Sequence, residues 1–436
     1  MLNVSKSLQP ATWYRATANP SALYPTLTGA VDCDVCVVGA GIAGCSTALH
    51  LAERGYRVVV LEQQNIGWGA SGRSGAQAIF GFAIAQDQLT RLIGERDARA
   101  AFDVSVEGLA LMKSLIAKHG IDCAWVDGQL HVAMRPRQDR DLRDWVDQLH
   151  ARHDYHSVSL LEREQLRGYI ASDRYSSAML DTNSGHLHPL NYTLGLARAA
   201  AAAGVRIFEH SRALRYEQQS ETPAAVAPLR VLTESGRVNC RQLVFCGNAG
   251  LGDTVPQLAR KVMAVATYVV ATEPLGESTA QMLLPHNSAV TDVNWVLDYF
   301  RRSADHRLLF GGRISYSGVD AVNSTRATVK RMRRVFPQLA SARIEYSWGG
   351  DVDLTLNRAP HFGRLAPNIY FMQGFSGHGM VLAAIAGKLV AEAIAGTNER
   401  FDVFARIPHH DFPGGLGLRR PALVLGMLWY RLRDLL

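Results

Sequence analysis

The sequence predicts an α/β fold, α+β overall, in which a parallel-sheet domain is interrupted by an inserted antiparallel sheet. Three observations lead to this prediction. A strand–helix–strand pattern covers residues 35–62, alternating β-branched segments dominate residues 262–347, and a second strand–loop–helix pattern covers residues 369–395. Because the two similar patterns flank the β-rich segment, we expect the first domain to be discontinuous in sequence.

The first pattern is typical of a dinucleotide-binding unit with a Rossmann-like fold. Val35–Val38 leads into glycines spaced G-x-G-x-x-G, a helix follows, and the second strand stops on an acid. The glycines allow a tight turn, close approach of a pyrophosphate and tight helix packing, and the helix N-terminus attracts the phosphates. The acid accepts hydrogen bonds from the ribose hydroxyls. We therefore expect dinucleotide binding by Gly39, Gly41, Gly44 and Glu62.

Two further features favour FAD over NAD. The glycine- and serine-rich loop Gly67–Gln77 follows Glu62, and it is long enough to track an extended dinucleotide toward a ring system. The second junction, Gly374–Gly379, precedes an apolar helix and supplies helix N–H groups for the edge of a flavin that becomes negative on reduction.

Composition limits the number of domains and the kinds of partner and site that are expected. The chain has 436 residues, 47% of them hydrophobic, so two or three domains are expected. The net charge of +7 is spread along the chain, which argues against a nucleic-acid partner. The six cysteines complete no metal-ligand spacing, and Cys33 and Cys36 are expected to point to alternate faces of a strand, so no metal site is predicted. Reduced cysteines and the lack of a signal-peptide pattern predict a cytoplasmic protein.

The pattern changes along the chain predict four regions. They are an N-terminal arm (1–30), a discontinuous FAD-binding domain (31–120, 185–261 and 349–400), an inserted substrate-binding domain (121–184 and 262–348), and a C-terminal helical tail (401–436). The aromatic residues of the arm are expected to pack the arm onto the surface. The apolar segment Arg419–Leu436, with its flanking arginines, is interpreted as packing on the protein or a partner subunit, or as a membrane-surface helix.

The chain also resembles a known family. The sequences G-A-G-I-A-G, G-A-S-G-R-S-G, L-V-F-C-G-N-A-G and G-F-S-G-H-G-M are similar to motifs of the D-amino-acid oxidase and glycine oxidase group of FAD-dependent oxidoreductases. Within that group, W-G-A-S-G-R-S-G-A-Q, L-D-Y-F-R-R and W-G-G-D-V-D-L-T-L-N-R-A-P most resemble the gamma-glutamylputrescine oxidoreductases. The resemblance covers roughly residues 30–400.

The resemblance implies further cofactor contacts. Gln63 would lie near the adenosine, four residues would follow the pyrophosphate and ring, and five would lie at the far edge of the ring. These sets are Ser71, Arg73, Ser74 and Gln77, and then Gly374, Ser376, Gly377, His378 and Gly379. Arg73 stands where some relatives carry a flavin-linked histidine, and no cysteine follows Cys246, so noncovalent FAD is predicted.

The expected reaction is oxidation of an amine. A neutral amine loses hydride to flavin N5, and water converts the resulting imine to an aldehyde. The resemblance implies gamma-glutamylputrescine or a similar secondary or gamma-glutamylated amine as substrate. Hydrogen peroxide forms if oxygen is the electron acceptor. The strand Leu308–Arg313 lacks the lysine with which related enzymes activate oxygen, which leaves another acceptor open.

The candidates for substrate contacts and catalysis are Tyr299, Arg301, Trp348 and His378. Arg301 would pair with a substrate carboxylate, or form a surface ion pair. Trp348 would line the pocket or fill core. His378 would place positive charge near the reduced flavin, or hold its loop.

Two other functions stay open at this point. One is an amine or D-amino-acid dehydrogenase that passes electrons to quinone at a membrane surface, docking through 419–436. The other is a non-catalytic flavoprotein subunit, which would be yellow but would not be bleached by any amine.

Overall fold

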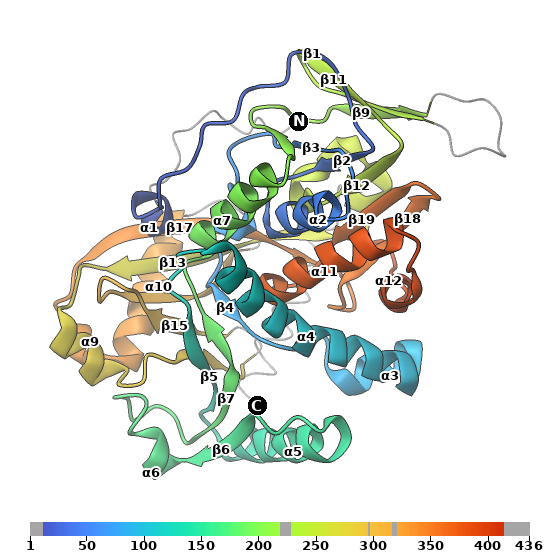
Figure 1. Cartoon of the computed structure of the whole chain (residues 1–436). Helices are drawn as coiled ribbons and strands as arrows, with labels where there is room; N and C mark the ends of the chain where they lie inside the picture. Colours follow the sequence, from blue (N-terminus) through green and yellow to red (C-terminus); the bar gives the residue numbers. More distant parts are fainter. Residues whose placement is uncertain (1–11, 219–227, 295–296, 316–320, 414–436) are drawn as a thin grey trace.

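The strands of the chain form three sheets in the computed structural model, which describes residues 12–218, 228–294, 297–315 and 321–413 (Figure 1). The central sheet has six strands in the order β18-β19-β12-β2-β3-β8. Five of these strands, from β19 to β8, run parallel to one another. The sixth, β18, pairs antiparallel with β19 at the edge of the sheet. Their bounds are β2 Val35–Val38, β3 Val58–Leu61, β8 Arg206–Phe208, β12 Gln242–Phe245, β18 His361–Ala366 and β19 Ile369–Gln373.

Helices cover one face of this sheet. Figure 1 shows α7 (Pro189–Ala202), α2 (Ile42–Ala52), α11 (Gly379–Ile394) and α4 (Glu95–His119) packed as neighbours. The strands are apolar on both faces because both faces are buried. In β2, for example, Val35 and Val37 belong to the cluster that packs on the helices.

A four-stranded sheet, in the order β1-β11-β10-β9, packs against the other face. Its strands are β1 Gly29–Asp32, β9 Arg215–Gln218, β10 Leu229–Leu232 and β11 Gly236–Cys240. This layer corrects one expectation. Cys33 and Cys36 do not point to opposite faces, because the chain bends between β1 and β2, and both thiols hydrogen-bond with Cys240.

The inserted sheet contains β17-β13-β16-β15-β14-β5-β7-β4, with β6 paired to β7. Its strands are β4 Gln77–Ala78, β5 Val126–Ala133, β6 Val158–Glu162, β7 Ser177–His186, β13 Met263–Thr272, β14 Ala289–Asp292, β15 Tyr299–Arg302, β16 Leu308–Ser315 and β17 Ile344–Leu354. One face packs on α10 (Ala321–Val335) through a second apolar cluster, and the other packs toward the first domain. The sheet is antiparallel except at β5 and β14, which are parallel.

The predicted α/β class is confirmed, with differences in detail. β14 and β18 are examples of strands that the sequence did not predict. β7 and β17 run across the predicted domain boundaries at 184/185 and 348/349, because their hydrogen-bonded ladders continue past them. The boundaries themselves stay a prediction. The segment Arg419–Leu436 lies outside the described residues.

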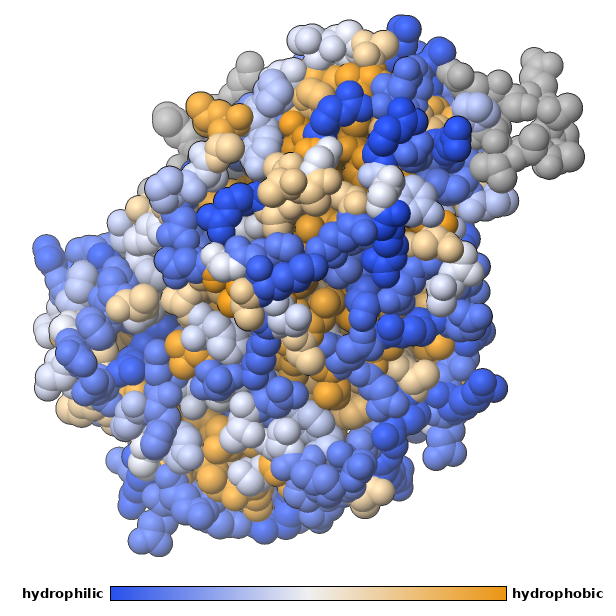
Figure 2. Space-filling model, in the orientation of Figure 1, coloured by the Kyte–Doolittle hydropathy of each residue, from blue (hydrophilic) through white to orange (hydrophobic). Residues whose placement is uncertain are grey.

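The remaining helices are short or peripheral. They are α1 Trp13–Ala16, α3 Gln86–Ile93, α5 Pro136–His153, α6 Arg163–Leu166, α8 Pro256–Ala259, α9 Glu277–Leu283 and α12 Glu399–Ala405. In the described part of the chain no single helix has the length and apolar character to cross a membrane; the bent pair α11 and α12 meets that test only as a pair. The face seen in Figure 2 is largely hydrophilic, with hydrophobic residues visible between the polar ones.

Candidate cofactor and substrate site

The first glycine-rich junction leaves no room for side chains. A Cβ on Gly44 would lie 1.8 Å from the carbonyl oxygen of Gly39, and a Cβ on Gly41 would lie 2.8 Å from Oγ of Ser71. Gly39 has a φ of +104°, which favours glycine. The backbone of α2 therefore begins directly at the end of β2, as a pyrophosphate site requires. Ser71 reaches this helix start, since the backbone N–H of Ile42 donates to its hydroxyl at 3.0 Å.

Glu62 lies at the carboxyl end of β3, beside this junction. Its carboxylate accepts hydrogen bonds from the backbone N–H of Ala40 at 2.8 Å and of Gln64 at 2.9 Å. The side chain is 8% exposed. Burial raises the pKa of Glu62, and the two backbone donors oppose that rise because they stabilise the carboxylate. Gln63 faces Gly250, where an added Cβ would lie 3.0 Å from its amide nitrogen.

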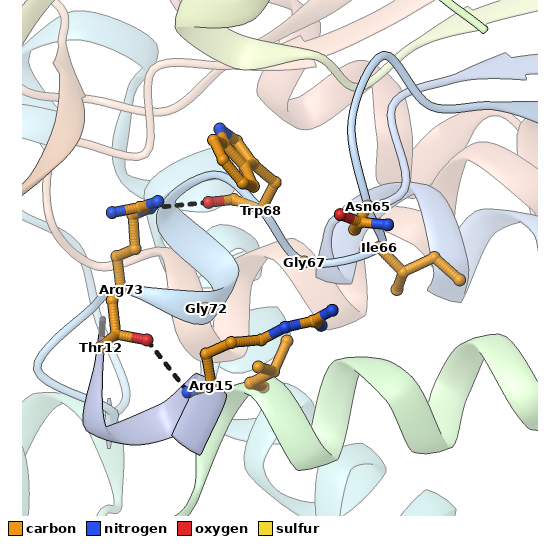
Figure 3. Close-up of a pocket in the computed structure, with 9 residues that line it drawn as sticks. Thr12, Arg15, Asn65, Ile66, Gly67, Trp68, Gly72 and Arg73 are labelled. Carbon is orange, nitrogen blue, oxygen red and sulfur yellow. Dashed lines mark hydrogen bonds between the residues drawn. The ribbon is translucent and has the colours of Figure 1, made fainter. Parts of the chain in front are cut away.

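The loop after Glu62 is anchored by its own side chains. In Figure 3, the guanidinium of Arg73 reaches back to the carbonyl oxygen of Trp68 at 2.8 Å, and its cation lies 5.1 Å from the centre of the indole ring. A second Arg73 nitrogen donates to the carbonyl of Gly349 at 3.1 Å. The cavity drawn there has a volume of about 20 Å³, which is room for a water molecule only. Arg73 therefore ties the loop to β17.

The same loop crosses one row of residues on the inserted sheet. The strand register places Trp348, Val269, Gly311, Tyr299, Thr291 and His131 side by side on one face. The indole N–H of Trp348 donates to the carbonyl of Arg73 at 3.0 Å. The ring of Tyr299 packs closely on Gly75, where a Cβ would lie 2.5 Å away. Thr291 donates its hydroxyl to the side-chain oxygen of Gln77.

These contacts place Tyr299 and Trp348 under the predicted cofactor loop. Trp348 is 2% exposed, so it is both a core residue and a wall of this region. Burial raises the pKa of Tyr299, which therefore stays protonated at neutral pH. The amide of Gln77 is held on β14, because its nitrogen also donates to the carbonyl of Val290 at 2.9 Å. Ser74 points toward α11, with its hydroxyl 3.5 Å from the sulfur of Met380.

The second junction is built on unusual backbone angles. Gly374, Ser376 and Gly377 have φ values of +68°, +53° and +98°. The backbone N–H of Ser376 donates to the carbonyl of Asp353 at 2.9 Å, and its hydroxyl donates to the carbonyl of Gly374 at 3.2 Å. The turn ends at His378, from which α11 begins at Gly379. The free N–H groups of this 16-residue helix therefore point along the helix axis, out of its N-terminal end at this junction.

His378 is neutral at physiological pH. Its pKa is lowered to about 4, first by burial and then by the charge of Arg358. A positive charge on this side chain beside a reduced flavin stays a prediction, which the lowered pKa does not favour at neutral pH. The positive end of the α11 dipole remains in the same place.

His131 was not predicted as a site residue, although it faces His378. Its pKa is lowered to about 3 by burial and then by His378, and it lies in the same sheet row as Tyr299. Thr291, which donates a hydrogen bond to Gln77, lies in the same row beside Tyr299 and was not predicted either. Neither residue belongs to a motif, and only the register of β5 and β14 brings them to the site.

Arg301 lies apart from this row. It is 3% exposed, so the alternative of a surface ion pair is wrong. Its guanidinium donates to the carbonyl of Gly75 at 3.3 Å, to the hydroxyl of Tyr14 at 3.1 Å and to the carbonyl of Arg302 at 3.1 Å. It lines a cavity on the side of the loop that faces the N-terminal arm.

The residues of the two junctions fit FAD. At the first junction the glycine backbone has no room for a Cβ, so a ligand can approach it closely. The carboxylate of Glu62 lies at the end of the adjacent strand. The loop 67–77 leads from there to the sheet row, and the second junction presents a helix N-terminus. In the described residues no group of three or more His, Cys, Asp or Glu side chains is arranged to hold a metal ion.

Comparisons with known proteins agree with this arrangement. The model of the DAO family, FAD dependent oxidoreductase, matches residues 34–393. Gamma-glutamylputrescine oxidoreductase of Escherichia coli (strain K12) is 42% identical over 425 residues, which cover 97% of this chain and 98% of that protein. The probable oxidoreductase OrdL of Haemophilus influenzae is 38% identical over 439 residues, covering 100% of this chain and 99% of that protein.

The solved structures include a glycine oxidase from Geobacillus kaustophilus with a TM-score of 0.74. It is 20% identical and covers 87% of this chain and 99% of its own, which supports the fold. The resemblance and the cofactor predicted from the motifs are confirmed by these matches. The individual site residues stay predictions.

Proposed function

Because the chain belongs to the DAO family of FAD dependent oxidoreductases, we propose that it oxidises a C–N bond in a gamma-glutamylated amine such as gamma-glutamylputrescine. The protein is an FAD-dependent oxidoreductase that acts on amines. The identity of the amine, the direct transfer of hydride and the electron acceptor belong to the proposal.

One observation supports gamma-glutamylputrescine as the substrate. The 42% identity to gamma-glutamylputrescine oxidoreductase extends over 97% of this chain and 98% of that protein. The similarity therefore includes the inserted sheet, which supplies the substrate side of the site, as well as the cofactor motifs.

FAD, when bound, supplies the two-electron oxidation of the C–N bond. The chain contributes binding and orientation. Gly39, Gly41, Gly44 and Glu62 would hold the dinucleotide, and the sheet row with Tyr299 and Trp348 would wall the amine. A buried apolar wall favours the neutral amine over the ammonium ion, and only the neutral amine can lose hydride. The phenol of Tyr299, which stays protonated, can donate a hydrogen bond to the substrate.

The test is anaerobic mixing of the purified yellow protein with a panel of amines while flavin absorbance is recorded. We expect gamma-glutamylputrescine to bleach the flavin faster than putrescine or glycine. Equal rates for all amines would contradict the substrate proposal, and no bleaching by any amine would favour the non-catalytic alternative.

The attachment of FAD and the electron acceptor can be tested separately. Acid precipitation should release the yellow colour into the supernatant, since FAD is proposed to be noncovalent; colour in the pellet would contradict this. The strand β16 carries no lysine, so reoxidation by oxygen should be slow compared with reoxidation by a quinone analogue. Rapid formation of hydrogen peroxide would show that oxygen is the acceptor instead.

A further inference from the structure

A second cavity lies between the N-terminal arm, α7 and the inserted sheet, apart from the row of residues that would wall the reacting amine. Its volume is about 250 Å³, the space of about eight water molecules. The residues around it come from five separate parts of the chain. Those that matter here are Trp13, Thr17, His186, His188, Arg301 and Asp305, with Asp122 and Ala304 at the exposed rim.

Within the described parts of the chain, no acidic side chain pairs with the charge of Arg301 at the floor of this cavity. Arg301 is 3% exposed and makes hydrogen bonds to the carbonyls of Gly75 and Arg302, the hydroxyl of Tyr14 and Nδ1 of His186. None of these four partners carries a negative charge. A guanidinium has five N–H donors and stays protonated, so one donor and the full positive charge are available to a ligand. An unpaired charge at such depth is costly unless an anion joins it.

The two histidines of the cavity are neutral, and their tautomers are defined. Burial and the charge of Arg301 lower the pKa of His186 and that of His188 to about 3. His186 accepts from Arg301 through Nδ1 and donates from Nε2 to the carbonyl of Asn287 at 2.7 Å. His188 accepts from the backbone of Asn191 through Nδ1, so its Nε2–H faces Thr17. Both rings add polar groups to the cavity without adding charge.

The acids nearby do not neutralise Arg301. The carboxylate of Asp305 is shared by Arg307, Ser303 and Trp13, at 2.7, 2.6 and 3.2 Å. Asp122 lies at the exposed rim. The cavity therefore has a buried cation at its floor and carboxylates nearer its mouth. This polarity matches a molecule with a carboxylate at one end and an ammonium group beside it.

We propose that this cavity binds the zwitterionic end of an amino acid, with its carboxylate on Arg301 and its ammonium group toward the rim. Two sources offer this chemistry: a free amino acid, and the glutamyl end of an amine substrate of the proposed kind. The volume accommodates either. The second source rests on the proposed function, whereas the first does not.

The cavity is connected to the cofactor loop. Arg301 holds the carbonyl of Gly75, and Tyr14 donates from its hydroxyl to the carbonyl of Ser74 at 3.0 Å while accepting from Arg301. A carboxylate that binds the guanidinium of Arg301 must weaken or redirect its hydrogen bonds to Gly75 and Tyr14. Occupation of the cavity is therefore expected to change the environment of the loop that lines the flavin, and so to shift the flavin absorbance spectrum.

The test is calorimetric titration of the FAD-loaded protein with L-glutamate, with the flavin spectrum recorded in parallel. Saturable binding should weaken at least about tenfold in Arg301→Met, which removes the charge and keeps the length of the side chain. Ala304→Trp, which fills the cavity from its exposed rim without breaking a hydrogen bond, should weaken binding as well and remains informative if the first variant fails to fold. Arg137→Met, an exposed arginine on α5, is the matched control and should bind like the wild type.

The outcomes separate the two sources. A raised KM for gamma-glutamylputrescine but not for putrescine in Ala304→Trp, together with weakened glutamate binding, assigns the cavity to the substrate's glutamyl end. Weakened glutamate binding with an unchanged KM assigns it to a free amino acid. The proposal is overturned if glutamate does not bind at about 20 mM, where even a site with a Kd near 1 mM would be filled, or if Arg301→Met binds it as well as the wild type. Because binding is measured without turnover, failure of the proposed oxidation would leave this test intact.

Discussion

The two glycine-rich junctions have similar sequences, yet their glycines answer different physical demands. In the first junction Gly39 needs its φ of +104°, but at Gly44 the demand is space: a Cβ would lie 1.8 Å from a backbone oxygen, although the residue is in a helix. In the second junction Gly374 also lacks space, since an added Cβ would lie 2.4 Å from the methyl carbon of Thr355, but at Gly377 the demand is conformation. Gly377 has a φ of +98° with no atom within 4 Å of an added Cβ, and Gly379 has an ordinary contact at 3.4 Å.

The difference follows from the neighbours of each junction. The first is enclosed between β2, β12 and loop 67–77, so the backbone itself must leave room for a ligand. The second turns sharply between β19 and α11, and Ser376 adopts a positive φ there without being glycine. A shared G-x-G spacing therefore does not imply shared sensitivity to substitution.

The largest effect is expected from Gly44→Ala. The added methyl group collides with the carbonyl of Gly39, so α2 must move away from β2, and the free energy of unfolding should fall by about 3 kcal/mol or more with loss of bound flavin. Thermal unfolding and the ratio of flavin to protein absorbance measure both. Gly379→Ala is the matched control from the second junction and should change little. Equal losses in the two variants would remove the distinction between the junctions.

An intermediate effect is expected from His378→Gln, through pH. The pKa of His378 is lowered to about 4, so the stability that the neutral ring contributes is present above pH 6.5 and is lost as pH falls through about 4. The variant lacks this titration, so its loss of stability between these pH values should be smaller by roughly 1–3 kcal/mol. Denaturant unfolding from pH 7 to 4 measures it. His286→Gln, at an exposed position, is the control and should follow the wild type.

The smallest effect is expected from Gly377→Ala. Since no atom obstructs the methyl group, only backbone strain counts, and about 1–2 kcal/mol of stability should be lost. Gly396→Ala, with a φ of +102° and equally open space beyond the junction, should lose a similar amount. Only Gly377→Ala should also weaken FAD binding, as measured by flavin release in dilution. Weakened binding in both variants would show that the second junction has no special relation to the cofactor.

Prediction from sequence succeeded where the signal is local. The strand Val35–Val38 and the apolar helix that follows the second junction both follow from apolar periodicity and glycine positions, and each is present with bounds close to those predicted. The prediction missed β14 because Ala289–Asp292 is short. One of its partner strands, β5, lies far from it in sequence, and the other, β15, begins only at Tyr299. A strand of this kind is specified by its partners rather than by its own residues.

The candidate site divides in the same way. The first junction, Glu62 and the second junction are motifs, and the sequence by itself determined the cofactor class through them. The sequence did not reveal that Tyr299, Thr291 and His131 share a row beneath the loop, because that depends on the register of three strands. It also did not reveal that Arg301 lies in a buried cavity beside Tyr14, a residue 287 positions away in sequence.

Local spacing is sufficient to specify a phosphate-binding turn, since the atoms that bind the ligand belong to the backbone of one short segment. The sequence alone therefore determined the family, the cofactor and the α/β class. Only the tertiary structure decided which side chains face that cofactor, which histidines are held neutral by burial, and where an unpaired guanidinium is enclosed. Each of these depends on the packing of segments distant in sequence, because desolvation and hydrogen bonding arise from neighbours in space.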